Sequence, residues 1–150
     1  MMKYDVCIVG HGEFPDGVKS AIDVLVGNND DVTCFNLNGQ MTHAQFTTYM
    51  KEYLAQHPQA LVFADMTGGA PYQLAAEIIL ESQHPNQYIV SSISMNAILD
   101  LYLKNSMDQL NPDNIEANFS HVLQESRKLM KVTPDMQEVA QEEVILEDGI

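Results

Sequence analysis

The sequence predicts an α/β domain: a doubly wound, mainly parallel sheet of four strands with helices on both faces. Short apolar runs alternate along the chain with longer segments in which apolar residues recur at helical spacing. The runs at 4–9 and 61–64 are almost entirely apolar, as expected of central strands covered on both faces. The 150 residues, 45% of them hydrophobic, suit one domain with a substantial core.

The first half of this pattern contains two strands and the helix that joins them. We expect the strands at residues 4–9 and 32–37. Pro15 fits the first turn of the helix, and Gly27 is a typical stop signal. Four apolar residues between these two follow helical spacing: Val18, Ala21, Ile22 and Leu25.

The next two helices are marked by their ends. Thr42 and Gln45 match the capping-box pattern at the start of one helix, and Pro58 ends it. Pro71 opens the following helix directly after the strand at 61–64. These signals place each helix between two consecutive strands, as a right-handed crossover requires.

The last third contains a fourth strand at 87–92 and helical patterns around 97–102 and 115–123. Residues 128–132 alternate in part, so we expect them to form an extra antiparallel edge strand. We assign residues 1–134 to the domain and 135–150 to an acidic C-terminal tail, which contains six Asp and Glu residues and no Lys or Arg.

Charge and cysteine content exclude several classes of partner. The formal net charge of −14 argues against binding to nucleic acid or anionic lipid. Cys7 and Cys34 both lie in expected strands and have no metal-ligand spacing, so we expect reduced thiols, a cytoplasmic location and no metal site. The N-terminus shows no signal-peptide pattern, and no apolar run approaches the ~20 residues of a membrane span.

Two titratable residues follow central strands. His11 follows the first strand and lies between Gly10 and Gly12, and Asp65 directly follows the strand at 61–64. Because parallel strands meet at the same edge of the sheet, both side chains should emerge where such folds bind ligands. An aspartate can fix the tautomer of a histidine and balance the charge of the ring once its free nitrogen has reacted.

A glycine-rich turn follows Asp65 and leads into a helix. Backbone N–H groups at such a turn bind anions, above all phosphate. We therefore expect a phosphate-binding set of Gly12, Thr67, Gly68, Gly69 and Ala70. Together with His11 this suggests phosphoryl transfer through phosphohistidine. The residues alone leave open that His11 is an ordinary loop residue and that Asp65 caps a turn.

Two stretches, His11-Gly-Glu-Phe14 and Asp65-Met-Thr-Gly-Gly-Ala-Pro71, resemble the motifs of the mannose-type enzyme IIA of the bacterial sugar phosphotransferase system. The similarity extends from about residue 4 to residue 132. It implies a doubly wound α/β fold and a homodimer that exchanges a C-terminal strand, for which 128–132 is the candidate. It also implies that His11 is the phosphorylated histidine and Asp65 its supporting carboxylate.

The resemblance also implies the partners. The phosphoryl donor would be the phosphorylated histidine carrier protein, and the acceptor enzyme IIB, which passes the group to sugar with the membrane subunits IIC and IID. The chain would then act in the cytoplasm and reach the inner face of the membrane only through partner subunits. No cofactor is expected.

One residue and one stretch depart from the family pattern. Ala70 replaces the usual Ser or Thr after Gly-Gly, and 92–97 lacks the usual Gly-x-Asn-x-Pro pattern. These departures bear on the choice of partner more than on the chemistry. Two alternatives remain: a non-catalytic dimeric regulatory module, or the phosphotransfer subunit of a dihydroxyacetone kinase system, which shares the fold and would deliver phosphate to a soluble kinase.

Overall fold

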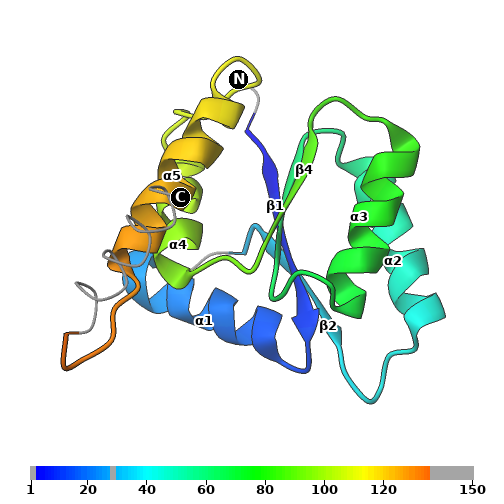
Figure 1. The fold of residues 1–150 in the computed structure, drawn as a ribbon. Helices are drawn as coiled ribbons and strands as arrows, with labels where there is room; N and C mark the ends of the chain where they lie inside the picture. The colour runs from blue at the N-terminus through cyan, green and yellow to red at the C-terminus, as the bar shows by residue number, and fades with distance from the viewer. Residues whose placement is uncertain (1–2, 28–29, 136–150) are drawn as a thin grey trace, which may run out of the picture.

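The computed structural model describes residues 3–27 and 30–135. Among these residues, four strands form one parallel sheet in the order β2-β1-β3-β4, with a helix after each strand and a further helix at the end (Figure 1). The strands are β1 Asp5–His11, β2 Val32–Leu37, β3 Ala60–Ala64 and β4 Gln87–Ser91. The helices are α1 Phe14–Val26, α2 His43–Gln56, α3 Ala70–Ser82, α4 Met95–Ser106 and α5 Ile115–Leu129.

The sheet separates two layers of helices. On one face α1, α4 and α5 pack over β1 and β3, and on the other face α2 and α3 cover the same strands (Figure 1). Alternate residues of β1 serve the two cores: Ile8 enters the first, and Cys7 and Val9 enter the second. Because both faces are covered, all five residues of β3 are buried. The predicted doubly wound fold is confirmed.

The strand order reverses between β1 and β3. The chain moves from β1 outward to β2, then crosses back over β1 to β3 and continues outward to β4. Loops after β1 and β3 therefore leave the sheet in opposite directions and open a space between them. In doubly wound folds this switch point is where ligands bind. His11 is the last residue of β1, and Asp65 directly follows β3.

Local sequence signals account for the helix starts. The Thr42 side chain accepts the N–H of Gln45, and the Gln45 side chain accepts the N–H of Thr42, so the predicted capping box is confirmed. Pro15 and Pro71 lie in the first turns of α1 and α3, where a missing N–H costs nothing.

The expected strand at 128–132 is wrong for the residues that the structure describes. Helix α5 continues through Leu129, and residues 130–132 join no sheet. Lys128 pairs with Glu125 one turn earlier, at 3.2 Å, and its charge complements the carbonyl end of the helix. These helical contacts outweigh the partial alternation. Of the acidic tail assigned to 135–150, residues 136–150 lie outside the described part of the chain.

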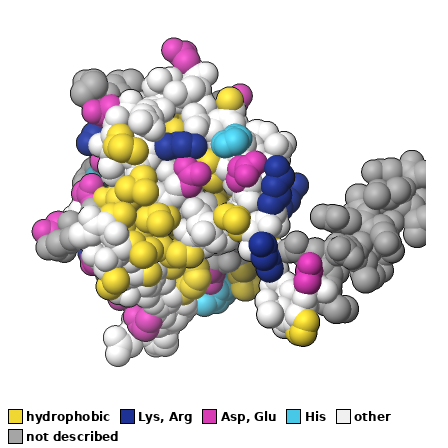
Figure 2. All heavy atoms as spheres, turned by 90° about the vertical axis from the view of Figure 1, so that its left-hand side faces the viewer, with side chains coloured by type: hydrophobic (Ala, Val, Ile, Leu, Met, Phe, Trp, Pro, Cys, Tyr) yellow, Lys and Arg dark blue, Asp and Glu magenta, His cyan; other side chains and the backbone are white. Residues whose placement is uncertain are grey.

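Figure 2 shows the face that carries α1, α4 and α5, where apolar side chains gather in one area. Exposed apolar residues of these helices include Val24 and Leu25 of α1 and Leu129 of α5. Such an area offers contact surface to another protein. No helix within 3–27 and 30–135 is both long and apolar enough to span a membrane.

Candidate active site

His11 and Asp65 meet at the switch point of the sheet. Nδ1 of the His11 ring lies 2.7 Å from Oδ2 of Asp65, and the backbone N–H of His11 donates to the same oxygen at 2.9 Å. The N–H of Met66 donates to the other carboxylate oxygen at 2.8 Å. The Asp65 side chain is 11% exposed and that of His11 is 47% exposed. The carboxylate is therefore shielded while the imidazole remains open to a partner.

These contacts determine the charge and tautomer of the pair. Burial alone would raise the pKa of Asp65, but the N–H and ring of His11 and the N–H of Met66 together hold it below its usual value. An ionised carboxylate can only accept, so the proton on the His11 ring resides on Nδ1. Nε2 then carries the lone pair of the ring that no protein group holds, and it is the atom that could act as a nucleophile.

Two glycines make room for this pair. A Cβ atom at Gly10 would lie 2.9 Å from the ring of Phe14 and 3.2 Å from the Asp65 side chain. A Cβ atom at Gly69 would lie 2.6 Å from Cε1 and 3.4 Å from Nε2 of His11. The His11 ring therefore lies directly against the backbone of Gly69, which a larger residue would prevent.

Gly69 is also the N-cap of α3, so Nε2 of His11 lies beside a helix N-terminus. Within the part of the chain that the structure describes, the N–H groups of Gly68 and Ala70 donate to no protein atom. The N–H of Gly69 makes only a long bond of 3.4 Å to the Met66 carbonyl. Free N–H groups at this end of a helix favour an anion such as a phosphoryl group.

The other members of the predicted phosphate-binding set differ in availability. The N–H of Gly12 donates to the Leu37 carbonyl at 2.9 Å, and the N–H of Thr67 donates to Ser92 Oγ at 2.9 Å. Both N–H groups are therefore engaged within the protein. Gly68, Gly69 and Ala70 are the members whose backbone can still face a ligand, and phosphate binding by this set stays a prediction.

Sequence reasoning missed two groups of contacts around the site. Glu13, next to the His11 turn, accepts from the side chains of Asn36 and Asn38, both at 2.9 Å. These bonds tie the turn after β1 to the end of β2. The second group comprises Thr67, Ser91 and Ser92, whose hydroxyls lie at the ends of β3 and β4. The sequence signal that could have indicated these contacts is the presence of polar residues at the ends of the expected strands.

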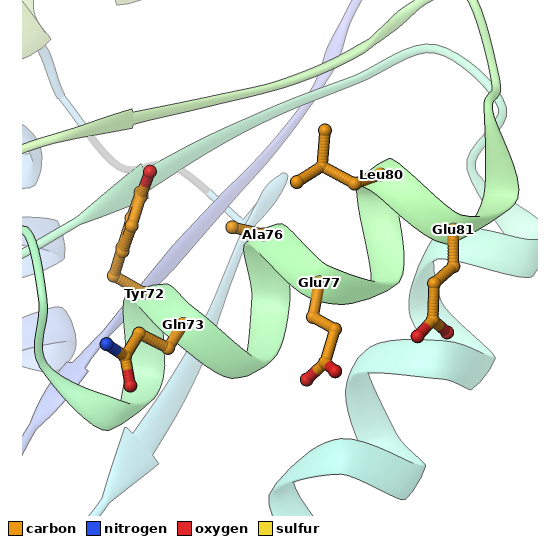
Figure 3. A pocket seen from close by; sticks show the side chains of 6 residues that line it. All are labelled: Tyr72, Gln73, Ala76, Glu77, Leu80 and Glu81. Atoms are coloured by element: carbon orange, nitrogen blue, oxygen red, sulfur yellow. The ribbon is translucent and has the colours of Figure 1, made fainter.

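A depression runs along α3, and neither His11 nor Asp65 is among its lining residues (Figure 3). One row of its side chains is apolar and the neighbouring row polar, and in Figure 3 they point to different sides of the helix. The lining residues are Tyr72, Ala76, Leu80, Gln73, Glu77 and Glu81.

No cluster of three or more His, Cys, Asp or Glu side chains within 3–27 and 30–135 could hold a metal ion.

A family model described as the fructose IIA component of the PTS system matches residues 5–117. A relative from Bacillus subtilis (strain 168), the PTS system fructose-specific EIIA component, is 32% identical over 82 residues. That alignment covers 52% of this chain and 56% of the relative, so the match spans little more than half the length of either protein.

Solved structures of similar fold include phosphotransferase system component EIIA from Streptococcus agalactiae, with a TM-score of 0.74 and 19% identity over 86% of this chain and 96% of the other. The mannose/sorbose specific IIA subunit from Enterococcus faecalis has a TM-score of 0.69 and 16% identity, covering 87% and 95% of the two chains. At these identities the structural likeness establishes the fold.

Proposed function

This chain belongs to the family of mannose- and fructose-type IIA components of the sugar phosphotransferase system, and we propose that it is a phosphoryl carrier that uses His11. The observation that carries the proposal is the 2.7 Å contact between His11 Nδ1 and the Asp65 carboxylate. This contact leaves Nε2 as a nucleophile next to the N-terminus of α3.

The proposed reaction is an in-line transfer between two imidazoles. The lone pair of His11 Nε2 attacks the phosphorus of a donor phosphohistidine, and the donor P–N bond breaks with its electron pair returning to the donor ring. The His11 ring becomes cationic and keeps its Nδ1–H bonded to Asp65, whose negative charge balances it. The N–H groups of Gly68 and Ala70 would bind the phosphoryl oxygens.

Transfer to the acceptor is the same reaction in reverse. Both reacting groups are imidazoles, so the two transfers are energetically similar and the carrier can load and unload readily. We propose the phosphorylated histidine carrier protein as donor and enzyme IIB as acceptor, with the IIC and IID membrane subunits served indirectly. The exposure of the His11 ring supports protein partners, because it can enter a partner's site.

We also propose that the protein is a homodimer that uses the free edge of β4. Among the described residues β4 pairs only with β3, so its outer edge has unpaired backbone groups. Helix α3 packs against β4 and carries Leu80, which is 74% exposed. Light scattering on the full chain should give twice the monomer mass, and Leu80→Asp should shift it toward the monomer. A wild-type monomer at micromolar concentration would contradict this assembly.

The carrier proposal is tested by incubating the protein with phosphoenolpyruvate, enzyme I and the histidine carrier protein. We expect a mass gain of one phosphate that is lost in acid, because phosphoramidates hydrolyse at low pH. His11→Ala should abolish the gain, whereas His43→Ala, at the exposed start of α2, should retain it. No mass gain, or the same gain in His11→Ala, would refute the proposal.

A further inference from the structure

Thr67 ties the turn after β3 to the end of β4. Its N–H donates to Ser92 Oγ at 2.9 Å, and its hydroxyl lies 2.9 Å from the same oxygen and 2.6 Å from Ser91 Oγ. Ser91 is the last residue of β4 and pairs with Ala64, the last residue of β3. The parallel register therefore brings three hydroxyl groups together at the carboxyl edge of the sheet.

Ser92 adopts an uncommon backbone conformation in order to make this contact. Its φ is 53°, in the left-handed region that a residue with a side chain rarely occupies. Glycine would adopt this φ with little strain, but it would offer no oxygen to the N–H of Thr67. The serine therefore supplies a hydrogen-bond acceptor at a position whose backbone geometry favours glycine.

The turn that begins at Thr67 reaches the imidazole of His11 two residues later. Gly68 follows with φ 88°, and the backbone of Gly69 then lies against Cε1 and Nε2 of His11. The two free N–H groups of this turn, on Gly68 and Ala70, flank the contact with the ring. Whatever fixes Thr67 therefore fixes where these donors lie relative to Nε2.

We infer that Ser91 and Ser92 are positioning residues for the relay histidine. They act through Thr67 to hold the turn at 67–70, so that its free N–H groups face the phosphoryl group on His11. This inference rests on the proposed function. It assigns a role to the end of β4, which lies next to β3 and therefore on the Asp65 side of His11.

The test compares wild type, Ser92→Gly, Ser91→Ala/Ser92→Gly, and the control Ser106→Ala. Ser92→Gly removes the hydroxyl that accepts the N–H of Thr67. This variant should fold, because glycine adopts the φ of residue 92 with little strain. Ser106 lies at the end of α4, and its hydroxyl donates only to the Tyr102 carbonyl one turn earlier. The first readout is the NMR signals of the His11 Cε1–H and the Gly69 amide in unphosphorylated protein. The second is the lifetime of the phosphorylated form.

We expect both serine variants to shift the two NMR signals and the control to leave them unchanged. The phosphorylated form should lose its phosphate roughly three- to tenfold faster in the double variant, about the effect of losing one or two hydrogen bonds. The Nδ1–H signal of His11 should remain, because Asp65 is untouched.

Unchanged Cε1–H and Gly69 signals in both serine variants would overturn the inference, whether or not the protein is phosphorylated. A shift of the signals with an unchanged lifetime would also overturn it, because the turn would then move without consequence for the phosphoryl group. If wild-type protein takes up no phosphate, the carrier proposal fails, and the two NMR signals decide the positioning role by themselves.

Discussion

A single oxygen of Asp65, Oδ2, accepts both the backbone N–H and the ring Nδ1 of His11, at 2.9 and 2.7 Å. The first bond fixes where β1 ends relative to β3, and the second fixes the orientation of the imidazole. One carboxylate therefore couples the position of the β1 end to the direction in which Nε2 of His11 points.

Asp65→Asn should slow phosphorylation of His11 about ten- to hundredfold, because a charge-assisted hydrogen bond contributes roughly 1.5–3 kcal/mol. The amide keeps the shape of the carboxylate but cannot balance the cationic ring. Initial rates of phosphate uptake from the carrier protein measure the effect. The matched control is Asp16→Asn, since Asp16 bonds to Asn36 and not to His11. Equal rates for the two variants would argue against a role for the Asp65 charge.

Gly69→Ala should impair phosphorylation with little effect on folding. The new methyl would lie 2.6 Å from Cε1 of His11, and a half-exposed side chain can swing away at small cost. We expect the free energy of unfolding to fall by less than about 1 kcal/mol while the rate of phosphate uptake falls roughly tenfold or more. Gly39→Ala is the control, because a methyl there meets open space. A normal rate in Gly69→Ala would show that the ring need not lie on this turn.

The ionisation of Asp65 should contribute to stability at neutral pH. The pKa of Asp65 is lower in the folded protein than its ordinary value of 3.8, so the unfolded chain binds the proton more tightly. The contribution is fully present above about pH 4–5 and is lost as the pH falls through the lowered pKa. Denaturant unfolding at pH 7 and pH 3 should show a smaller pH-dependent loss in Asp65→Asn than in wild type. The same loss in both proteins would contradict the assignment.

Asn105 provides a test of the fold that leaves the site untouched. Its buried side chain accepts the N–H of Tyr4 at 3.0 Å and donates to the Tyr4 carbonyl at 2.8 Å, just before β1 begins. Asn105→Ala leaves the N–H and carbonyl of Tyr4 without a hydrogen-bond partner. It should lower the free energy of unfolding by about 2–4 kcal/mol. Urea unfolding measures this, with Asn118→Ala as the control, because the half-buried Asn118 side chain donates to Asn114 one turn earlier at the start of α5. Phosphate uptake at 25 °C should stay near the wild-type rate, and loss of uptake in folded protein would contradict this separation.

The fold and the central pair could be predicted because their signals are local. Buried apolar runs end at His11 and Asp65, and glycines and prolines mark the turns, so parallel topology alone brings the two residues to one edge. The bounds of β2 at Val32 and Leu37 agree with the expectation for the same reason.

The contacts that support the pair could not be predicted because they depend on register between distant strands. Glu13 meets Asn36 because Gly10 of β1 lies opposite Asn36 of β2, and Ser91 meets Thr67 because Ala64 pairs with Ser91. No spacing within one segment reveals such pairings. The expected strand at 128–132 failed for a different reason: a short, partial alternation was compatible with a helix end as well.

The most direct test of the central claim is to identify the ring nitrogen that carries the phosphoryl group. Protein with 15N-labelled histidine is phosphorylated by the carrier protein, and the nitrogen–phosphorus coupling assigns the bond. The Asp65 contact predicts phosphorus on Nε2 of His11, with the proton retained on Nδ1. Phosphorus on Nδ1, or on any histidine other than His11, would contradict the account.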